Sequence, residues 1–246
     1  MVGYLPIADE EVQPGAPLLS SLGVRLRDNP IAIAEGWQDA PNVLRKRVRL
    51  FTSSGTWTKP DQIRCVEVWV VGGGGGGGSA GSVGGGYAGG GGGSAVRVID
   101  RDDLPASVTV TVGSGGAGGS VQGTGDAGEA GQNGGTSSFG SLVSATGGVG
   151  GGGGEGGSGP GGSPGAGGTG SGGDVNLRGQ GGSDVWGGGQ GAGPFGGKHN
   201  SLSGNATTSQ NYGVGGGYRT GTRAEGRNGS AGVVVVIEYL GGEADQ

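Results

Sequence analysis

The chain has 246 residues, of which 72 are glycine, whereas hydrophobic residues make up only 31%. With three Phe, four Trp and one Met, the supply of large apolar side chains excludes an ordinary enzyme core of full size and favours a fibrous or repeat-like protein. The net charge of -5 provides no field for binding a polyanion, so nucleic acid is not an expected partner.

Targeting signals and metal ligands are equally sparse. Cys65 is the single cysteine, so no disulfide can form within one chain, and one Cys with one His cannot build a zinc site. The N-terminus lacks a basic region followed by an apolar stretch, and the uncharged run at 72–96 is too weakly apolar for a bilayer. We expect a soluble, non-secreted protein without membrane insertion, metal or cofactor.

Residues 1–43 contain proline and little glycine, and we expect them to form an N-terminal attachment arm with short helices. Within 17–27 the apolar residues are spaced as in a helix that ends before Asp28-Asn29-Pro30. Residues 31–35 are expected to add another helical turn. Because such short helices are marginal alone, the arm is expected to pack on something larger.

From residue 43 the pattern changes to period two, with Val48 and Leu50 on one face and Arg47 and Arg49 on the other. Further strands are expected at 64–71, 95–99, 107–112, 138–145, 174–178 and 232–240. The first and last of these bracket the glycine-rich part and are suited to pair with each other. Six or seven short strands are enough for a small antiparallel β-sandwich.

Glycine recurs at every third position in three long runs, which begin at Gly72, Gly113 and Gly147 and are interrupted only by Tyr87 in the first and Gln122 in the second. Period three is that of an extended left-handed helix, and glycine lets backbones approach closely enough for lateral hydrogen bonds. We therefore expect a mainly β fold whose long glycine-rich insertions form polyglycine-II-like helices that fold back on themselves. A collagen helix is disfavoured by the shortage of proline, and a disordered linker remains the alternative.

Several apparent catalytic motifs are products of the glycine density. Trp69-Val-Val-Gly72 with Gly74 and Gly77 matches a dinucleotide-binding pattern, and 77–81 and 161–165 match a nucleophile elbow, but no helix-forming sequence follows any of them. Gly197-Lys198 fails as a phosphate loop because His199 replaces the Ser or Thr. The sequence therefore predicts a protein that is not an enzyme.

Aromatic and large polar residues gather late in the glycine-rich part, between Trp186 and Arg227, where the triplet order is weakest. If the ordered runs are a scaffold, these segments are its loops and provide a recognition surface; the alternative is that the aromatic residues cap a small core. The candidate receptor-binding residues are Trp186, Phe195, His199, Asn200, Tyr212, Tyr218, Arg219 and Arg223.

An ordered series of motifs carries a resemblance to a known class. It begins with Phe51-Thr-Ser-Ser-Gly-Thr-Trp57-Thr-Lys-Pro60 and 66–75, continues through 89–98, 108–113, 134–140, 143–148 and 173–179, and ends at 232–239. In order and spacing this series resembles the glycine-rich tail-fibre proteins of tailed bacteriophages over about residues 50 to 240. Upstream, residues 26–36 are similar to a segment that precedes such a domain in phage and prophage tail fibres, and tail-tip adhesins with stacked glycine-rich helices are more loosely similar.

The resemblance implies a virion protein of the distal tail, made in the host cytoplasm, with an arm at 1–43, a glycine-rich tail-fibre domain at 44–240 and a C-terminal tail at 241–246. It implies a homotrimer that docks on other tail or baseplate proteins through residues 1–50. Its other partner would be a host surface receptor, either a glycan or an outer-membrane protein.

Two other functions compete with receptor binding. One is a purely structural role as a tail or baseplate decoration or spacer. The other is a glycan depolymerase, which is disfavoured because no carboxylate pair stands in a framework of strand repeats.

Overall fold

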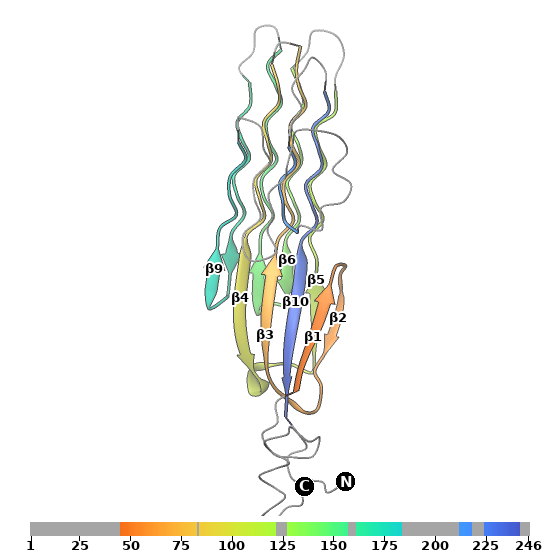
Figure 1. Ribbon diagram of the computed structural model, residues 1–246, viewed down its shortest axis with the longest axis vertical. Coiled ribbons are helices and arrows are strands. Elements are labelled where there is room, and N and C mark those ends of the chain that lie inside the picture. Colours follow the sequence, from red (N-terminus) through yellow and green to blue (C-terminus); the bar gives the residue numbers. More distant parts are fainter. Residues whose placement is uncertain are drawn as a thin grey trace, which may run out of the picture.

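The computed structural model describes residues 45–82, 84–121, 127–156, 161–183, 212–217 and 224–241. Strands form a sandwich at one end of the molecule, and the glycine-rich stretches rise from it as a long bundle (Figure 1). The arm expected at 1–43, with its short helices, lies outside the described residues. Within the described ranges the only helix is the 3-10 turn η2 (Arg101–Asp103), so the protein is mainly β, as predicted.

Sheet A contains the two strands that bracket the glycine-rich part. Its order is β1 (Arg45–Phe51), β10 (Val233–Leu240), β3 (Ile63–Val71), β4 (Ser94–Asp100) and β9 (Val175–Leu177), and all neighbours are antiparallel. The expected pairing of β3 with β10 is confirmed, with Val68 opposite Val236. The start and the end of the glycine-rich part therefore lie side by side.

Sheet B is also antiparallel, in the order β2 (Gly55–Thr58), β5 (Ser107–Thr111), β6 (Ser137–Phe139), β7 (Val143–Ala145) and β8 (Gly170–Ser171). The single strand expected at 138–145 is wrong. It is two short strands around a turn in which Gly140 has a φ of 56°, a left-handed conformation that favours glycine. β2 and β8 were not expected, so the expected number of strands was too low.

The core lies between the two sheets. Valines of β3 and β10 meet Trp57 of β2 and Phe139 of β6, whose rings pack edge to face with centroids 5.4 Å apart. Each fully buried Val or Phe contributes about 1.5–3 kcal/mol. Since the core residues are mainly valine, this is the small core that the composition indicated.

A buried carboxylate joins the sheets at the β1 edge. Glu238 of β10 has no exposed surface, and its Oε1 accepts a 2.7 Å hydrogen bond from Trp57 Nε1. Arg47 Nε donates to Glu238 Oε2, and Arg49 Nε lies 3.2 Å from Oε1. The alternation expected for β1 is therefore correct, and its arginine face is on the side of Glu238, with Arg47 44% and Arg49 47% exposed at the edge of the sandwich. Its other face, with Val48 and Leu50, is exposed.

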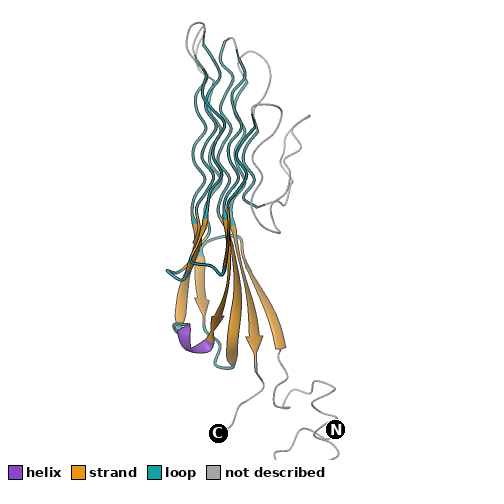
Figure 2. Ribbon diagram, turned by 90° about the vertical axis from the view of Figure 1, so that its left-hand side faces the viewer, coloured by secondary structure: helices purple, strands orange, loops and turns teal. Residues whose placement is uncertain are grey.

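The strands continue directly into the glycine bundle, whose extended segments are drawn as teal loops in Figure 2. β3 leads into residues 72–81, which we call the central segment, and residues 84–93 return to β4. The glycine bundle comprises these two segments together with 113–121, 127–135, 146–156, 161–169, 179–183, 212–217 and 224–232. The runs thus fold back, as expected, and each of the three glycine registers covers an outgoing and a returning segment.

Candidate functional site

Backbone hydrogen bonds with a period of three hold the glycine bundle together. Successive N–H groups of the central segment donate in rotation to three different neighbours: Gly72 to Gly93 at 3.0 Å, Gly73 to Gly135 at 2.9 Å and Gly74 to Ser230 at 2.9 Å. The same rotation repeats from Gly75 and again from Gly78. Each turn of three residues therefore bonds to segments 84–93, 127–135 and 224–232.

The carbonyl groups of the central segment accept from three further neighbours, which are 113–121, 146–156 and 212–217. For example, Gly148 donates to Gly73 and Gly216 donates to Gly75. Adjacent members of this ring of six are also bonded to one another, as Arg227 N is to Gly217 O. The central segment is thus enclosed on all sides by backbone, and every N–H group from Gly72 to Gly81 and the carbonyl groups of Gly73–Gly77 and Ser79 are bonded to other backbone groups without water.

This enclosure explains why the central segment has seven consecutive glycines, Gly72 to Gly78. A Cβ added at Gly76 would lie 1.9 Å from the carbonyl oxygen of Ala117, and one at Gly74 would lie 2.0 Å from that of Val214. Both distances are far below any real contact of a Cβ atom. No other residue type fits there, because the obstacle is backbone and cannot move aside as a side chain would.

Segments on the outside of the bundle carry side chains on their free faces. Ser114 and Ala117 point to solvent, while Gly113 and Gly116 face neighbouring backbone. Some outer side chains replace a missing backbone partner. Asn133 Oδ1 accepts from Gly150 N at 2.9 Å, and Asn228 Oδ1 accepts from Gly118 N at 2.8 Å. The sequence of the outer surface can thus vary, but the side-chain amides of Asn133 and Asn228 are needed for these lateral hydrogen bonds.

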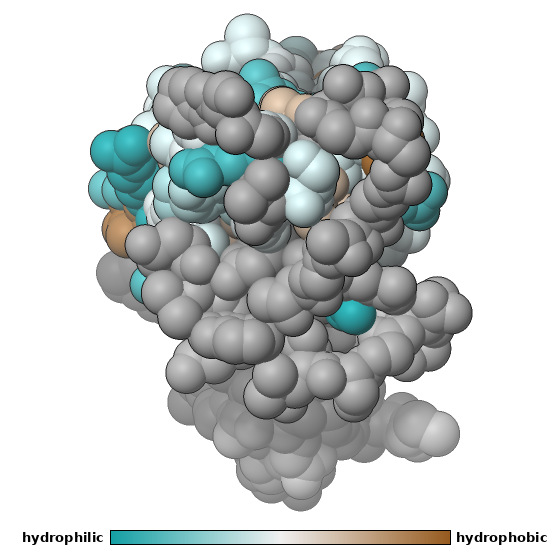
Figure 3. Space-filling view, turned by 90° about the horizontal axis from the view of Figure 1, so that it is seen from above, coloured by the Kyte–Doolittle hydropathy of each residue, from teal (hydrophilic) through white to brown (hydrophobic). Residues whose placement is uncertain are grey.

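The end of the bundle away from the sandwich is where outgoing segments turn back. Gly81 N donates to Gly84 O there, and Ser79 Oγ donates to Ser120 O at 2.6 Å. The connections between Val121 and Ala127, between Gly156 and Gly161 and between Gly217 and Ala224 also begin and end at this end, which we call the distal end. Seen from that side, the visible described residues are mainly pale or hydrophilic (Figure 3).

Of the eight candidate receptor-binding residues, Tyr212 is the one that the structure describes. It is half-buried and packs beside Val71, Val233 and Val235 where the glycine bundle meets sheet A, which is the opposite end of the bundle from the distal end. The others lie outside the described residues: Trp186, Phe195, His199, Asn200, Tyr218, Arg219 and Arg223. In sequence Tyr218, Arg219 and Arg223 stand between Gly217 and Ala224, two described residues near the distal end.

The division of the chain into ordered runs and a late loop region needs correction. Residues 212–217 and 224–232 fall late in the chain, yet they are neighbours of the central segment within the glycine bundle. Sequence reasoning also missed the central place of 72–81, for which the uninterrupted glycine run was the available signal. The roles of Asn133 and Asn228 had no such signal, because their partners are remote in sequence.

Neither a cluster of metal ligands nor a membrane-spanning helix occurs in the described part of the chain. Among them, no group of three His, Cys, Asp or Glu side chains lies together so that it could hold a metal ion. No helix within the described ranges has the length and apolar character that a membrane crossing requires.

Comparison with known proteins gives one match. The family described as "Glycine-rich domain" matches residues 51–239, which covers the sandwich from the end of β1 to β10 and the whole glycine bundle. No curated protein matches the chain. Since the match extends over most of the 246 residues, the chain belongs to the glycine-rich domain family.

Proposed function

We propose that this protein is a tail-fibre protein of a tailed bacteriophage that attaches the virion to a receptor on the host surface. The observation that supports it best is the elongated shape, with the sandwich at one end and the turns of the glycine bundle at the other (Figure 1). Membership of the glycine-rich domain family and the ordered motif series of residues 50–240 agree with this proposal.

The bundle segments are proposed to be polyglycine-II-like helices. Rotation of the bonding partner at every third residue is the behaviour of a helix with three residues per turn and a rise of about 3.1 Å per residue. At that rise the ten residues of the central segment extend roughly 30 Å. Such a bundle is a stiff support because each enclosed segment is bonded to neighbours on every side.

The two ends of the molecule suit different partners. Arg45 at the start of β1 pairs with Leu240 at the end of β10, so the described chain begins and ends at the side of the sandwich opposite the bundle. Residues 1–50 would dock on other tail or baseplate proteins there. The distal end would then face the host, and as a homotrimer the protein would bind multivalently, so weak contacts at each copy would still give firm attachment.

Connections on a rigid support are where recognition residues gather in many proteins. The receptor site is therefore proposed at the distal end, in the connection between Gly217 and Ala224, with Tyr218, Arg219 and Arg223 as its first candidates. Tyr212 is removed from this proposed site, because it packs against Val71 and Val233 at the sandwich.

The alternative is a spacer or decoration without a receptor of its own. The lateral hydrogen bonds of the bundle would serve that role equally well, since they stiffen the molecule whatever its end contacts. Binding to cells distinguishes the two functions.

The test uses the full chain, fluorescently labelled at its N-terminus, with host bacteria and with intact virions. We expect the chain to bind the cells and to slow virion adsorption in competition. Replacing Tyr218, Arg219 and Arg223 together by Ala should reduce both effects at least about tenfold, since aromatic and Arg anchors dominate interfaces. The matched control is Arg178→Ala, an exposed arginine beside β9 at the sandwich end of the bundle.

A folded chain that neither binds host cells nor competes with virions would establish the spacer and refute receptor binding. Equal losses in the triple variant and in the Arg178→Ala control would refute the distal site. Electron microscopy of virions labelled with an antibody to the chain tests the proposed place at the distal tail.

A further inference from the structure

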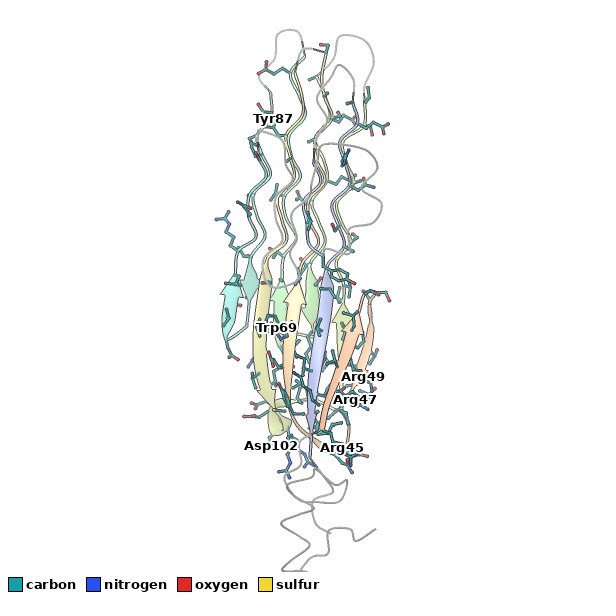
Figure 4. The ribbon with its side chains drawn as sticks, viewed as in Figure 1. Arg45, Arg47, Arg49, Trp69, Tyr87 and Asp102 are labelled. Carbon is teal, nitrogen blue, oxygen red and sulfur yellow. The ribbon has the colours of Figure 1, made fainter. Side chains whose placement is uncertain are left out.

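The outer face of sheet A, which points away from sheet B, carries an apolar row that crosses all its strands. Leu50 of β1 is opposite Val235 of β10, which is opposite Trp69 of β3. The row continues through Val96 of β4 to Val175 of β9. Since Val68 and Val70 point into the core, Trp69 between them points outward, and Figure 4 shows it near the middle of the sheet.

A second row extends this surface, with Val48, Ile237, Glu67 and Val98. The Glu67 carboxylate within it accepts hydrogen bonds from Trp69 Nε1 at 2.8 Å and from the Tyr239 hydroxyl at 3.1 Å. Val48 is 59% exposed, Leu50 57%, Val98 53% and Val175 50%. Single exposed apolar residues are normal on any protein, but a contiguous set on a flat sheet marks an interaction surface. We call these two rows the outer apolar face. Tyr212 packs against the cluster of Val71, Val233 and Val235 at one end of this face, and Val235 in the first row is only 5% exposed.

The two edges of the outer apolar face carry opposite charge. Lys46 lies on the outer side of β1, with its Nζ 5.9 Å from the centre of the Tyr239 ring. At the other edge Asp100 ends β4, and Asp102 and Asp103 follow in η2 beside Arg101, so this edge is net acidic. Figure 4 shows Arg45 and Asp102 on opposite sides of the lower sandwich. Three strand spacings of about 4.8 Å separate β1 from β4, so within one chain the edges are roughly 14 Å apart, well beyond direct pairing.

We propose that the outer apolar face of sheet A binds a second copy of this chain, with the basic β1 edge of one copy against the acidic η2 edge of the next. An apolar centre with a charged rim is the usual anatomy of a specific interface. Opposite charges on the two edges make the surface complementary to itself in a head-to-tail arrangement, which closes into a ring. This assignment rests on the exposed face and is independent of receptor binding, so the cell-binding experiment does not decide it.

The test measures the mass of the full chain by light scattering after size exclusion, over a range of concentrations. Val98→Asp places a charge in the outer apolar face, and the control Val149→Asp makes the same change at a 44% exposed valine of the glycine bundle. We expect a closed oligomer for the wild type and for Val149→Asp. Val98→Asp should raise the dissociation constant at least about thirtyfold.

Both side chains are exposed in the single chain, so neither change should disturb folding, which circular dichroism of the monomer checks. A monomeric wild type, or a Val98→Asp variant that assembles as the wild type does, would overturn the proposal. The reaction rate of Cys65 with a maleimide tests whether anything covers the outer apolar face, because this thiol lies on the outer side of β3 opposite Tyr239. Protection of Cys65 in a monomer would assign the face to residues 1–44 of the same chain.

A charge exchange tests the contact between the two edges. Lys46→Glu and Asp102→Lys should each weaken assembly, and the two changes in one chain should restore it, because the altered edges then meet each other. The effects should shrink in high salt, where the charges are screened. If the double variant assembles more weakly than either single variant, the head-to-tail arrangement is overturned.

Discussion

The enclosure of the central segment makes Gly76→Ala a decisive test of the bundle. The new Cβ would lie 1.9 Å from Ala117 O, whereas real Cβ atoms essentially never approach within 3.0 Å. Segment 113–121 would therefore have to move outward by about 1.1 Å or more, the difference between these two distances. Two 2.8 Å hydrogen bonds join it to the central segment, from Gly116 to Gly74 and from Gly119 to Gly77, and this shift breaks both.

Each lost hydrogen bond costs about 0.5–1.5 kcal/mol, and overpacking a tight interior costs about 1–3 kcal/mol. We therefore expect Gly76→Ala to lower the free energy of unfolding by roughly 2–6 kcal/mol, a large part of the total stability of a domain. Urea unfolding, followed by the fluorescence of the buried Trp57, measures this loss. The expected effect arises from backbone crowding and not from helix or strand propensity.

Gly181→Ala is the matched control. Its new Cβ would lie 3.5 Å from Gly165 O, an ordinary contact, at an exposed position of the bundle. Because the folded chain accepts the methyl group and the unfolded chain loses freedom, its stability should change by less than about 1 kcal/mol. Similar stabilities for the two variants would refute the reasoning that the central glycines are required by enclosure.

Three further predictions concern single side chains. Glu238→Ala should lose about 1–3 kcal/mol of stability, because it leaves the buried Trp57 Nε1–H without its acceptor, whereas the partly exposed Arg47 and Arg49 can turn to water. Glu238→Gln should lose less, since its amide oxygen still accepts from Trp57; thermal unfolding compares the two variants, and equal losses would contradict this. Burial first, and then the negative charges of Asp100 and Glu67, raise the pKa of the Cys65 thiol above 9.0. The monomer should therefore react with iodoacetamide more slowly than the urea-unfolded chain below pH 9.0, and the difference should narrow as pH rises through the folded pKa; equal rates would disprove the shift. Asn228→Ala should speed hydrogen exchange at the Gly118 amide, measured by NMR, while the exchange of Gly150, which bonds to Asn133, stays unchanged; a change at both would argue against local bonding.

Part of the fold could be predicted from alternation and part could not. The strand at 232–240 was predictable because β-branched residues run without interruption over 233–237, and the strand at 64–71 because Val66, Val68 and Val70 alternate with other residues. The hairpin at Gly140 was missed because no charged residue or proline interrupts Ser138 to Ala145, and a positive φ leaves no mark beyond a single glycine. The exposed side of β1 was equally hidden, since alternation defines two faces but does not tell which one meets Glu238.

The candidate site was predicted less completely than the fold. Aromatic and charged residues after Trp186 suggested loops, but Tyr212 lies against the sandwich and Arg227 bonds within the glycine bundle. Their lateral partners are far away in sequence, so no local pattern distinguishes a bundle segment from a connection. The three-residue spacing was visible in the sequence, whereas the neighbour that each segment would meet was not.

The sequence by itself determined the elements that depend on local chemistry: valine-rich strands, glycine at three-residue spacing and a core too small for an ordinary enzyme. Only the tertiary structure decided which glycine run is central, because enclosure is a property of six neighbours brought together from distant parts of the chain. It also decided that Glu238 is buried against Trp57 and that Val48 and Leu50 remain exposed. Burial and register arise from long-range pairing, and local sequence specifies neither.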